Sequence, residues 1–190
     1  DKARIVHELN RLILESNDDD SIAVMYAGHG HLVEKTQRGY WIPGKASADD
    51  PKQWLSNHDI ARALGNIPAK QIFLISDSCY SGTLTREGTV DRVDIPSDPQ
   101  AVLGMRSVTA LSSGGEEPVA DEGKDGHSVF AWHLMEQLKA VKDVSLGVGV
   151  YEQIAERVKT EIPQTPQYGA NLSSGHQRGG DYLFEVRQNR

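Results

Sequence analysis

Short apolar runs that alternate with stretches of helical periodicity constrain the fold of this chain more than any other feature. The apolar runs occupy residues 21–27, 71–76 and 107–111. Each has the length and composition of one buried strand in a parallel sheet. Apolar residues recur every three or four positions, as on one face of a helix, within residues 2–16, 130–141 and 150–158. Strands that alternate with helices predict an α/β fold with a mostly parallel sheet between two layers of helices.

Size and charge exclude several classes of protein. The 190 residues fit one domain, and we expect residues 1–190 to form a single unit. No apolar run approaches the roughly 20 residues that span a bilayer, so we expect no membrane association through a helix. The net charge of −7 is opposite to that of a general nucleic-acid binder, so we expect no nucleic-acid partner.

Cys79 is the single cysteine of the sequence. One cysteine can form neither an internal disulfide nor a cysteine-based zinc site, and the histidines lack the spacing of metal ligands. We therefore expect no metal ion or other cofactor. A lone cysteine also suits a reducing compartment, and nothing from Asp1 onward resembles a signal peptide, so we expect a cytoplasmic protein.

The segments between the runs predict turns and caps. Residues 31–34 and 40–43 flank a polar turn, which predicts a small hairpin. Ser56 stands three residues before Asp59, a variant of the capping-box spacing that predicts the start of a helix. Residues 182–186 predict a last strand.

Two unusual loops follow two of the expected strands. Gly28-His29-Gly30 follows the first, and residues 77–82, with Cys79 among them, follow the second. Functional residues of parallel sheets gather in loops at the carboxyl ends of strands, and neighbouring strands lie about 4.8 Å apart. These loops therefore supply a thiol, an imidazole base and backbone N–H groups, as a cysteine peptidase requires. Taken singly, a lone cysteine is more often a small buried hydrophobe, and a histidine beside glycine is more often an ordinary loop residue.

The same loops resemble motifs of a known superfamily. YAGHG at 26–30 and DSCYSG at 77–82 are similar to the histidine and cysteine motifs of caspase-like peptidases, above all of metacaspases and bacterial orthocaspases. The two reactive residues lie 50 positions apart, as in that superfamily, although the Gln-Ala-Cys sequence of true caspases is absent. TPQYG at 165–169 and GGDYLF at 179–184 resemble the end of such domains. The resemblance covers residues 2–186 and implies a caspase-like α/β fold.

The resemblance also implies an activity, that of a cysteine endopeptidase cleaving after Arg or Lys in regulated proteolysis, cell death or defence. It implies that His29 is the base, that Cys79 is the nucleophile, and that the N–H groups of Gly30 and Cys79 form the oxyanion hole. Asp77, and less directly Glu117, would line the S1 pocket for the basic P1 residue; the alternative for Asp77 is a turn-stabilising role. The expected partner is a protein or peptide substrate with a basic P1 residue.

Two alternatives remain open at this point. Caspase-like domains usually begin with a strand and a helix ahead of the helix that we expect at 2–16, so the first strands are expected to be missing from this chain. A separate N-terminal fragment, a shortened sequence or a divergent fold would each explain that. The other class of function is a catalytically silent caspase-like module that serves as a regulatory or scaffold partner. Silent relatives generally lose the His or the Cys, whereas this sequence has both, which favours the enzyme.

Residues 83–104 are polar and contain Pro96 and Pro99, so we expect a long exposed loop there. Arg86 and Arg92 lie within it and match the expected P1 preference. Because exposed loops are preferred sites of cleavage, the sequence predicts self-cleavage in this segment.

Calcium is required by many metacaspases, which bind it through clustered aspartates. The corresponding places here read Gly44-Lys45 and Asn57-His58-Asp59. A lysine repels a cation that needs carboxylate and other oxygen ligands, so we expect catalysis to need no calcium.

Overall fold

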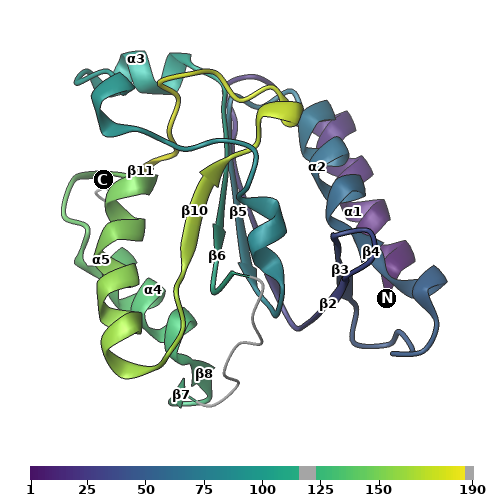
Figure 1. Ribbon diagram of the computed structural model, residues 1–190. Helices are drawn as coiled ribbons and strands as arrows, with labels where there is room; N and C mark the ends of the chain where they lie inside the picture. Colours follow the sequence, from purple (N-terminus) through teal and green to yellow (C-terminus); the bar gives the residue numbers. More distant parts are fainter. Residues whose placement is uncertain (116–122, 187–190) are drawn as a thin grey trace.

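A computed structural model describes residues 1–115 and 123–186 and has the three-layer α/β arrangement expected from the sequence (Figure 1). Its central sheet has the strand order β1-β5-β6-β10. These strands are β1 (Ser21–Ala27), β5 (Gln71–Asp77), β6 (Ser107–Ser112) and β10 (Gln167–Ala170). The first three pair in parallel and β10 runs antiparallel to β6, so the expectation of a mostly parallel sheet is confirmed.

Helices cover both faces of this sheet (Figure 1). They are α1 (Lys2–Glu15), α2 (Asn57–Asn66), α3 (Pro99–Gly104), α4 (Val129–Ala140) and α5 (Gly147–Glu161). The pair α1 and α2 lies on one face, and the pair α4 and α5 lies on the other. The helical periodicity of the sequence therefore marks three of these four helices, α1, α4 and α5, and the cap spacing at Ser56 marks the fourth, α2.

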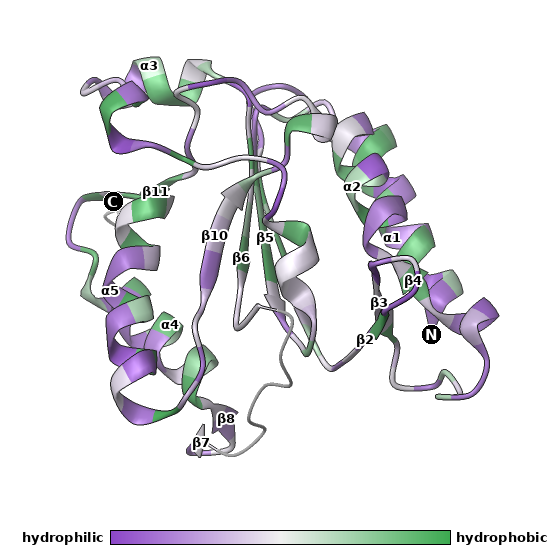
Figure 2. Cartoon of the chain, in the orientation of Figure 1, coloured by the Kyte–Doolittle hydropathy of each residue, from purple (hydrophilic) through white to green (hydrophobic). Residues whose placement is uncertain are grey.

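Strand β5 connects the two halves of the core, because its side chains alternate between the faces of the sheet. Ile72 and Leu74 pack in the cluster beneath α1 and α2, whereas Phe73 and Ile75 pack in the cluster beneath α4 and α5. Burying such a side chain stabilises the fold by about 1.5–3 kcal/mol. Figure 2 shows β5 and β6 as hydrophobic, while hydrophilic residues occupy much of the outer helix surfaces. This double burial explains why these strands appear in the sequence as continuous apolar runs.

Smaller sheets border the central one. An antiparallel sheet contains β2 (His29–Val33), β3 (Arg38–Ile42) and β4 (Leu55–Ser56). The expected hairpin is thus present, but each of its two strands starts two residues earlier than the sequence indicated. The last expected strand forms β11 (Leu183–Glu185), which pairs with β9 (Val144–Leu146) instead of joining the central sheet, and β7 (Gly123–Lys124) pairs with β8 (His127–Ser128).

The expectation of one long loop over residues 83–104 is wrong in part. The segment contains the end of η2 (Ser81–Leu84), the short helix η3 (Arg92–Asp94) and α3. Asp98 caps α3 by accepting hydrogen bonds from the N–H groups of Gln100 and Ala101, and Pro99 occupies the first helical position. Proline favours that position, so here it starts a helix instead of marking a loop.

In the described part of the chain, β1 forms one edge of the central sheet, and its Met25 is 55% exposed. No helix within residues 1–115 and 123–186 is long and apolar enough to cross a membrane.

Candidate active site

Cys79 lies in a tight turn after β5, at the carboxyl end of the central sheet. The next residue, Tyr80, adopts the left-handed conformation with φ 59°, and η2 begins directly after it. Serine hydroxyls hold the turn: Ser78 Oγ lies 3.0 Å from Ser76 Oγ, and Ser81 Oγ donates to the Ser78 carbonyl oxygen at 2.8 Å. Because the turn is held on both sides by hydrogen bonds, the half-buried Cys79 has a defined position at the carboxyl end of the central sheet.

His29 is the first residue of β2, so it begins a strand and does not stand in a loop as the sequence suggested. The Gly28 N–H donates to the Asp77 carbonyl oxygen at 3.1 Å, which ties the end of β1 to the end of β5. The Tyr26 hydroxyl lies 2.8 Å from the carbonyl oxygen of His29 and 2.9 Å from that of Ile42. These contacts fix the backbone that carries the exposed imidazole.

Tyr26 also connects the hairpin to the turn of the cysteine. Its ring stacks on Trp41 with ring centroids 4.2 Å apart and an interplanar angle of 9°. The Trp41 Nε1–H donates to Ser76 Oγ at 3.1 Å, and Ser76 in turn contacts Ser78. Burial of the phenol raises the pKa of Tyr26 to about 12, so its hydroxyl stays protonated at neutral pH. A continuous set of contacts therefore joins the segment of His29 to the segment of Cys79.

The two motifs meet because their strands are neighbours. Ala27 at the end of β1 pairs with Asp77 at the end of β5. Beyond the strands, the backbone of Gly30 lies so close to Cys79 that a Cβ at residue 30 would overlap the Cys79 carbonyl oxygen. The structure thus brings together a thiol, a strand that carries an imidazole and the backbones of both proposed oxyanion donors at the carboxyl end of the central sheet.

Asp77 points to the opposite face of the sheet from Ser76, toward α4. Its Oδ2 accepts a hydrogen bond from Ser128 Oγ at 2.5 Å. Ser128 is the N-cap of α4, and its Oγ also accepts from the Ala131 N–H at 2.9 Å. Asp77 therefore links the end of β5 to the start of α4, a long-range contact that differs from a local turn-stabilising role.

Sequence reasoning did not assign roles to Ser128, Tyr26 or Trp41. For Ser128 a signal existed, because it precedes the helical stripe that begins at Phe130, as an N-cap does. Tyr26 and Trp41 gave no such signal, since their stacking depends on how the hairpin folds back. Glu117, the second expected acid of the S1 pocket, lies outside the described residues.

Within residues 1–115 and 123–186, no three His, Cys, Asp or Glu side chains gather closely enough to hold a metal ion. Asp50 caps the short helix η1 (Pro51–Gln53), and Asp59 accepts hydrogen bonds from Ser56 and Arg62.

The fold, and the meeting of the His29 and Cys79 motifs at the carboxyl end of the central sheet, define a protein of the caspase-like α/β class. A family model described as the caspase domain (Peptidase_C14) matches residues 1–178, so the chain belongs to this family of cysteine peptidases. Its fold is similar to the crystal structure of protein GSU0716 from Geobacter sulfurreducens, with a TM-score of 0.60 and 16% sequence identity over 95% of this chain and 79% of that one. Among curated protein sequences, no match was found.

Proposed function

We propose that this chain is a cysteine endopeptidase that cleaves peptide bonds after Arg or Lys by means of His29 and Cys79. The observation that carries the proposal is the close approach of Gly30 to the backbone of Cys79, which brings the two motifs to one edge of the sheet. Membership of the caspase-domain family supports the same reading.

In the proposed reaction His29 accepts the thiol proton of Cys79, and the thiolate sulfur bonds to the carbonyl carbon of the substrate. The N–H groups of Gly30 and Cys79 then stabilise the negative carbonyl oxygen. The C–N bond breaks as the protonated His29 donates its proton to the leaving amine. A water molecule, deprotonated by His29, finally hydrolyses the thioester and restores the thiol.

The P1 preference rests on Asp77. Its carboxylate lies on the α4 side of the sheet, two residues before the nucleophile, and is half-buried. A carboxylate in that setting forms charge-assisted and geometrically specific hydrogen bonds with a guanidinium group. Asp77 therefore favours Arg or Lys and disfavours an acidic P1 residue.

The test is hydrolysis of fluorogenic peptides that end in Arg, Lys or Asp, by the wild type, Cys79→Ala and His29→Ala. We expect cleavage after Arg and Lys, no turnover by Cys79→Ala, and a loss of about 10²–10⁴-fold in His29→Ala. A Cys79→Ala protein with a tenth of wild-type activity would refute the nucleophile, and cleavage after Asp alone would refute the specificity. Unchanged labelling of Cys79→Ala by an Arg-ended electrophile, together with no turnover by the wild type, would favour the scaffold alternative.

Calcium independence is a further part of the proposal. Lys45 stands near one of the places where calcium-dependent relatives carry acids, and its charge disfavours a divalent cation. We expect the same rate in excess chelator as in millimolar calcium. A rate that vanishes in chelator and returns with calcium would overturn this expectation.

Self-cleavage is proposed within residues 83–104. Arg92 forms a bidentate ion pair with Glu152, so cleavage after Arg92 requires that pair to open first. Arg86, the other candidate P1 residue in this segment, precedes η3. Mass spectrometry of incubated wild type and Cys79→Ala identifies the cut, and identical intact masses in both samples would refute it.

A further inference from the structure

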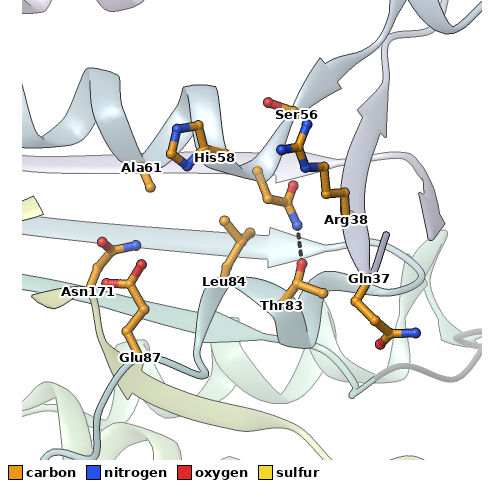
Figure 3. Close-up of a pocket in the computed structure, with 11 residues that line it drawn as sticks. Gln37, Arg38, Ser56, His58, Ala61, Thr83, Leu84, Glu87 and Asn171 are labelled. Atoms are coloured by element: carbon orange, nitrogen blue, oxygen red, sulfur yellow. Dashed lines mark hydrogen bonds between the residues drawn. The ribbon is translucent and has the colours of Figure 1, made fainter. Parts of the chain in front are cut away.

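A cavity of about 180 Å³ lies beside the proposed active site and has no role in the mechanism above. The start of β3, the first turn of α2 and the segment after Cys79 line it (Figure 3). It contains neither His29 nor Cys79. Its walls are nonetheless connected to the nucleophile turn, since Asn57 at the start of α2 donates a hydrogen bond to Thr83, four residues after Cys79.

The hairpin gives the position of the cavity relative to the nucleophile. Gly30, whose backbone contacts Cys79, pairs with Trp41 in the hairpin. Two positions further along, Leu32 pairs with Gly39. Gly39 lines the cavity. Two residues of extended chain span roughly 7 Å, so the cavity starts about two substrate residues away from the scissile bond.

The roles of the two motifs decide which half of the substrate approaches this cavity. Asp77, which would hold the P1 side chain, lies on the α4 side of the sheet. His29 must reach the leaving amine to protonate it, and His29 begins the hairpin on the α2 side. The substrate residues that follow the scissile bond therefore extend toward the hairpin and the cavity.

Arg38 gives one end of the cavity a cationic character, and His58 lies beside it. Both line it and both are exposed. Over residues 1–115 and 123–186, neither side chain has a hydrogen-bond or ion-pair partner, so the guanidinium of Arg38 is available to a ligand. Figure 3 shows Arg38 and His58 near Ser56, whereas Glu87 lies beside Asn171 at the other end. Glu87 is itself occupied, because it accepts hydrogen bonds from the N–H and the hydroxyl of Ser173 at 2.7 and 2.8 Å.

We propose that this cavity is a subsite for an acidic side chain, carried by the second or third substrate residue after the scissile bond and bound by Arg38. The proposal rests on the proposed peptidase function. A guanidinium group binds a carboxylate through two parallel hydrogen bonds, so Asp or Glu fits this end and Lys is repelled. The substrate class becomes peptides with a basic residue before the cleaved bond and an acidic residue shortly after it.

The test uses quenched fluorescent peptides with Arg at P1 and Asp, Asn or Lys at the second or third position after the bond. For the wild type we expect kcat/KM to favour Asp over Lys by about tenfold at one of these positions, as for one charge-assisted hydrogen bond. Arg38→Glu should abolish or reverse this preference. Lys35→Glu is the matched control, because Lys35 lies in the same hairpin, is exposed, makes the same charge change and does not line the cavity.

Two results would overturn the subsite. One is that the ratio of kcat/KM for the Asp peptide to that for the Lys peptide is the same in the wild type and in Arg38→Glu. The other is that Lys35→Glu changes this ratio as much as Arg38→Glu does. A substrate that ends in Arg-aminomethylcoumarin has no residue after the bond and separates the two proposals. If the wild type and Arg38→Glu cleave this substrate equally, and the wild type shows no preference for Asp over Lys after the bond, the subsite fails and the peptidase function stands. If neither cleaves any peptide, the proposed function itself fails.

Discussion

Gly30 and Cys79 are in backbone contact, although they lie 49 positions apart in the sequence. The parallel pairing of β1 with β5 creates this contact, because it places the carboxyl ends of the two strands side by side. Residue 30 has no room for a side chain there, so the glycine is needed for close approach and its φ is not positive. The same contact sets where both proposed oxyanion donors lie.

Gly30→Ala should therefore lose activity without losing the fold. The new Cβ must push the hairpin away from the Cys79 turn, which displaces the oxyanion donors; loss of one such donor costs about 10²–10³-fold in kcat. Gly44→Ala is the control, since a Cβ at Gly44 meets no atom within 4 Å. Activity of Gly30→Ala within twofold of Gly44→Ala would contradict the assignment.

Ser128 should affect both stability and substrate binding, because its hydroxyl caps α4 and also binds Asp77. Ser128→Ala should lower the free energy of unfolding by about 1 kcal/mol through the lost cap. It should also raise KM for Arg-ended peptides, since Asp77 loses a hydrogen bond that orients it. Ser128→Thr keeps a hydroxyl and should retain both properties. Urea unfolding and steady-state kinetics measure the two effects, and a Ser128→Ala protein with wild-type KM would contradict the second.

Tyr26 is predicted to act as a positioning residue for His29 through its hydroxyl. Tyr26→Phe keeps the stacking on Trp41 but loses the hydroxyl contacts, so kcat should fall about tenfold with little change in KM. Tyr40→Phe is a matched control, because Tyr40 lies on β3 of the hairpin that Tyr26 contacts and its ring packs edge-on against Trp54.

A double-mutant cycle separates this role from a general structural one. If Tyr26 acts through the imidazole, Tyr26→Phe should have no further effect on kcat in a His29→Ala background. Equal effects of Tyr26→Phe in both backgrounds would show that the hydroxyl acts elsewhere.

His176 should make the fold less stable in mild acid. Burial lowers the pKa of its imidazole below the usual 6.5, and its Nδ1 accepts a hydrogen bond from the Val108 N–H at 3.1 Å. Because the pKa of His176 is lower in the folded than in the unfolded chain, its neutral imidazole contributes its full stabilisation above pH 6.5. This stabilisation is lost as the pH falls through the pKa of the folded state. We expect this loss to reach up to about 1 kcal/mol, discounted because part of the ring meets solvent.

The comparison is unfolding at pH 7.5 and 5.5 in the wild type, His176→Asn and His7→Gln. Asn Oδ1 can replace the acceptor but does not titrate, so His176→Asn should lose less stability on acidification. His7 lies exposed on α1 and serves as the control. Parallel losses in all three proteins would show that His176 does not carry the effect.

The sequence alone was sufficient for the layered α/β fold, because burial on both faces leaves a continuous apolar run, as in 71–76, and burial on one face leaves helical spacing, as in 130–141. It also placed His29 and Cys79 after strands, since both motifs directly follow such runs. The prediction of a loop at Pro99 was wrong, because proline is common both in loops and at the first position of helices, and only the cap by Asp98 distinguishes the two.

Tertiary structure decided what depends on partners distant in sequence. Whether β1 pairs with β5, and in which register, follows from how the whole sheet assembles, and only that register brings Gly30 against Cys79. Strand β10 was visible as a motif, but its antiparallel place beside β6 was not. The bond from Ser128 to Asp77 likewise joins residues 51 positions apart. Local periodicity records which face of an element is buried, whereas the identity of the neighbour across that face is a property of the assembled fold.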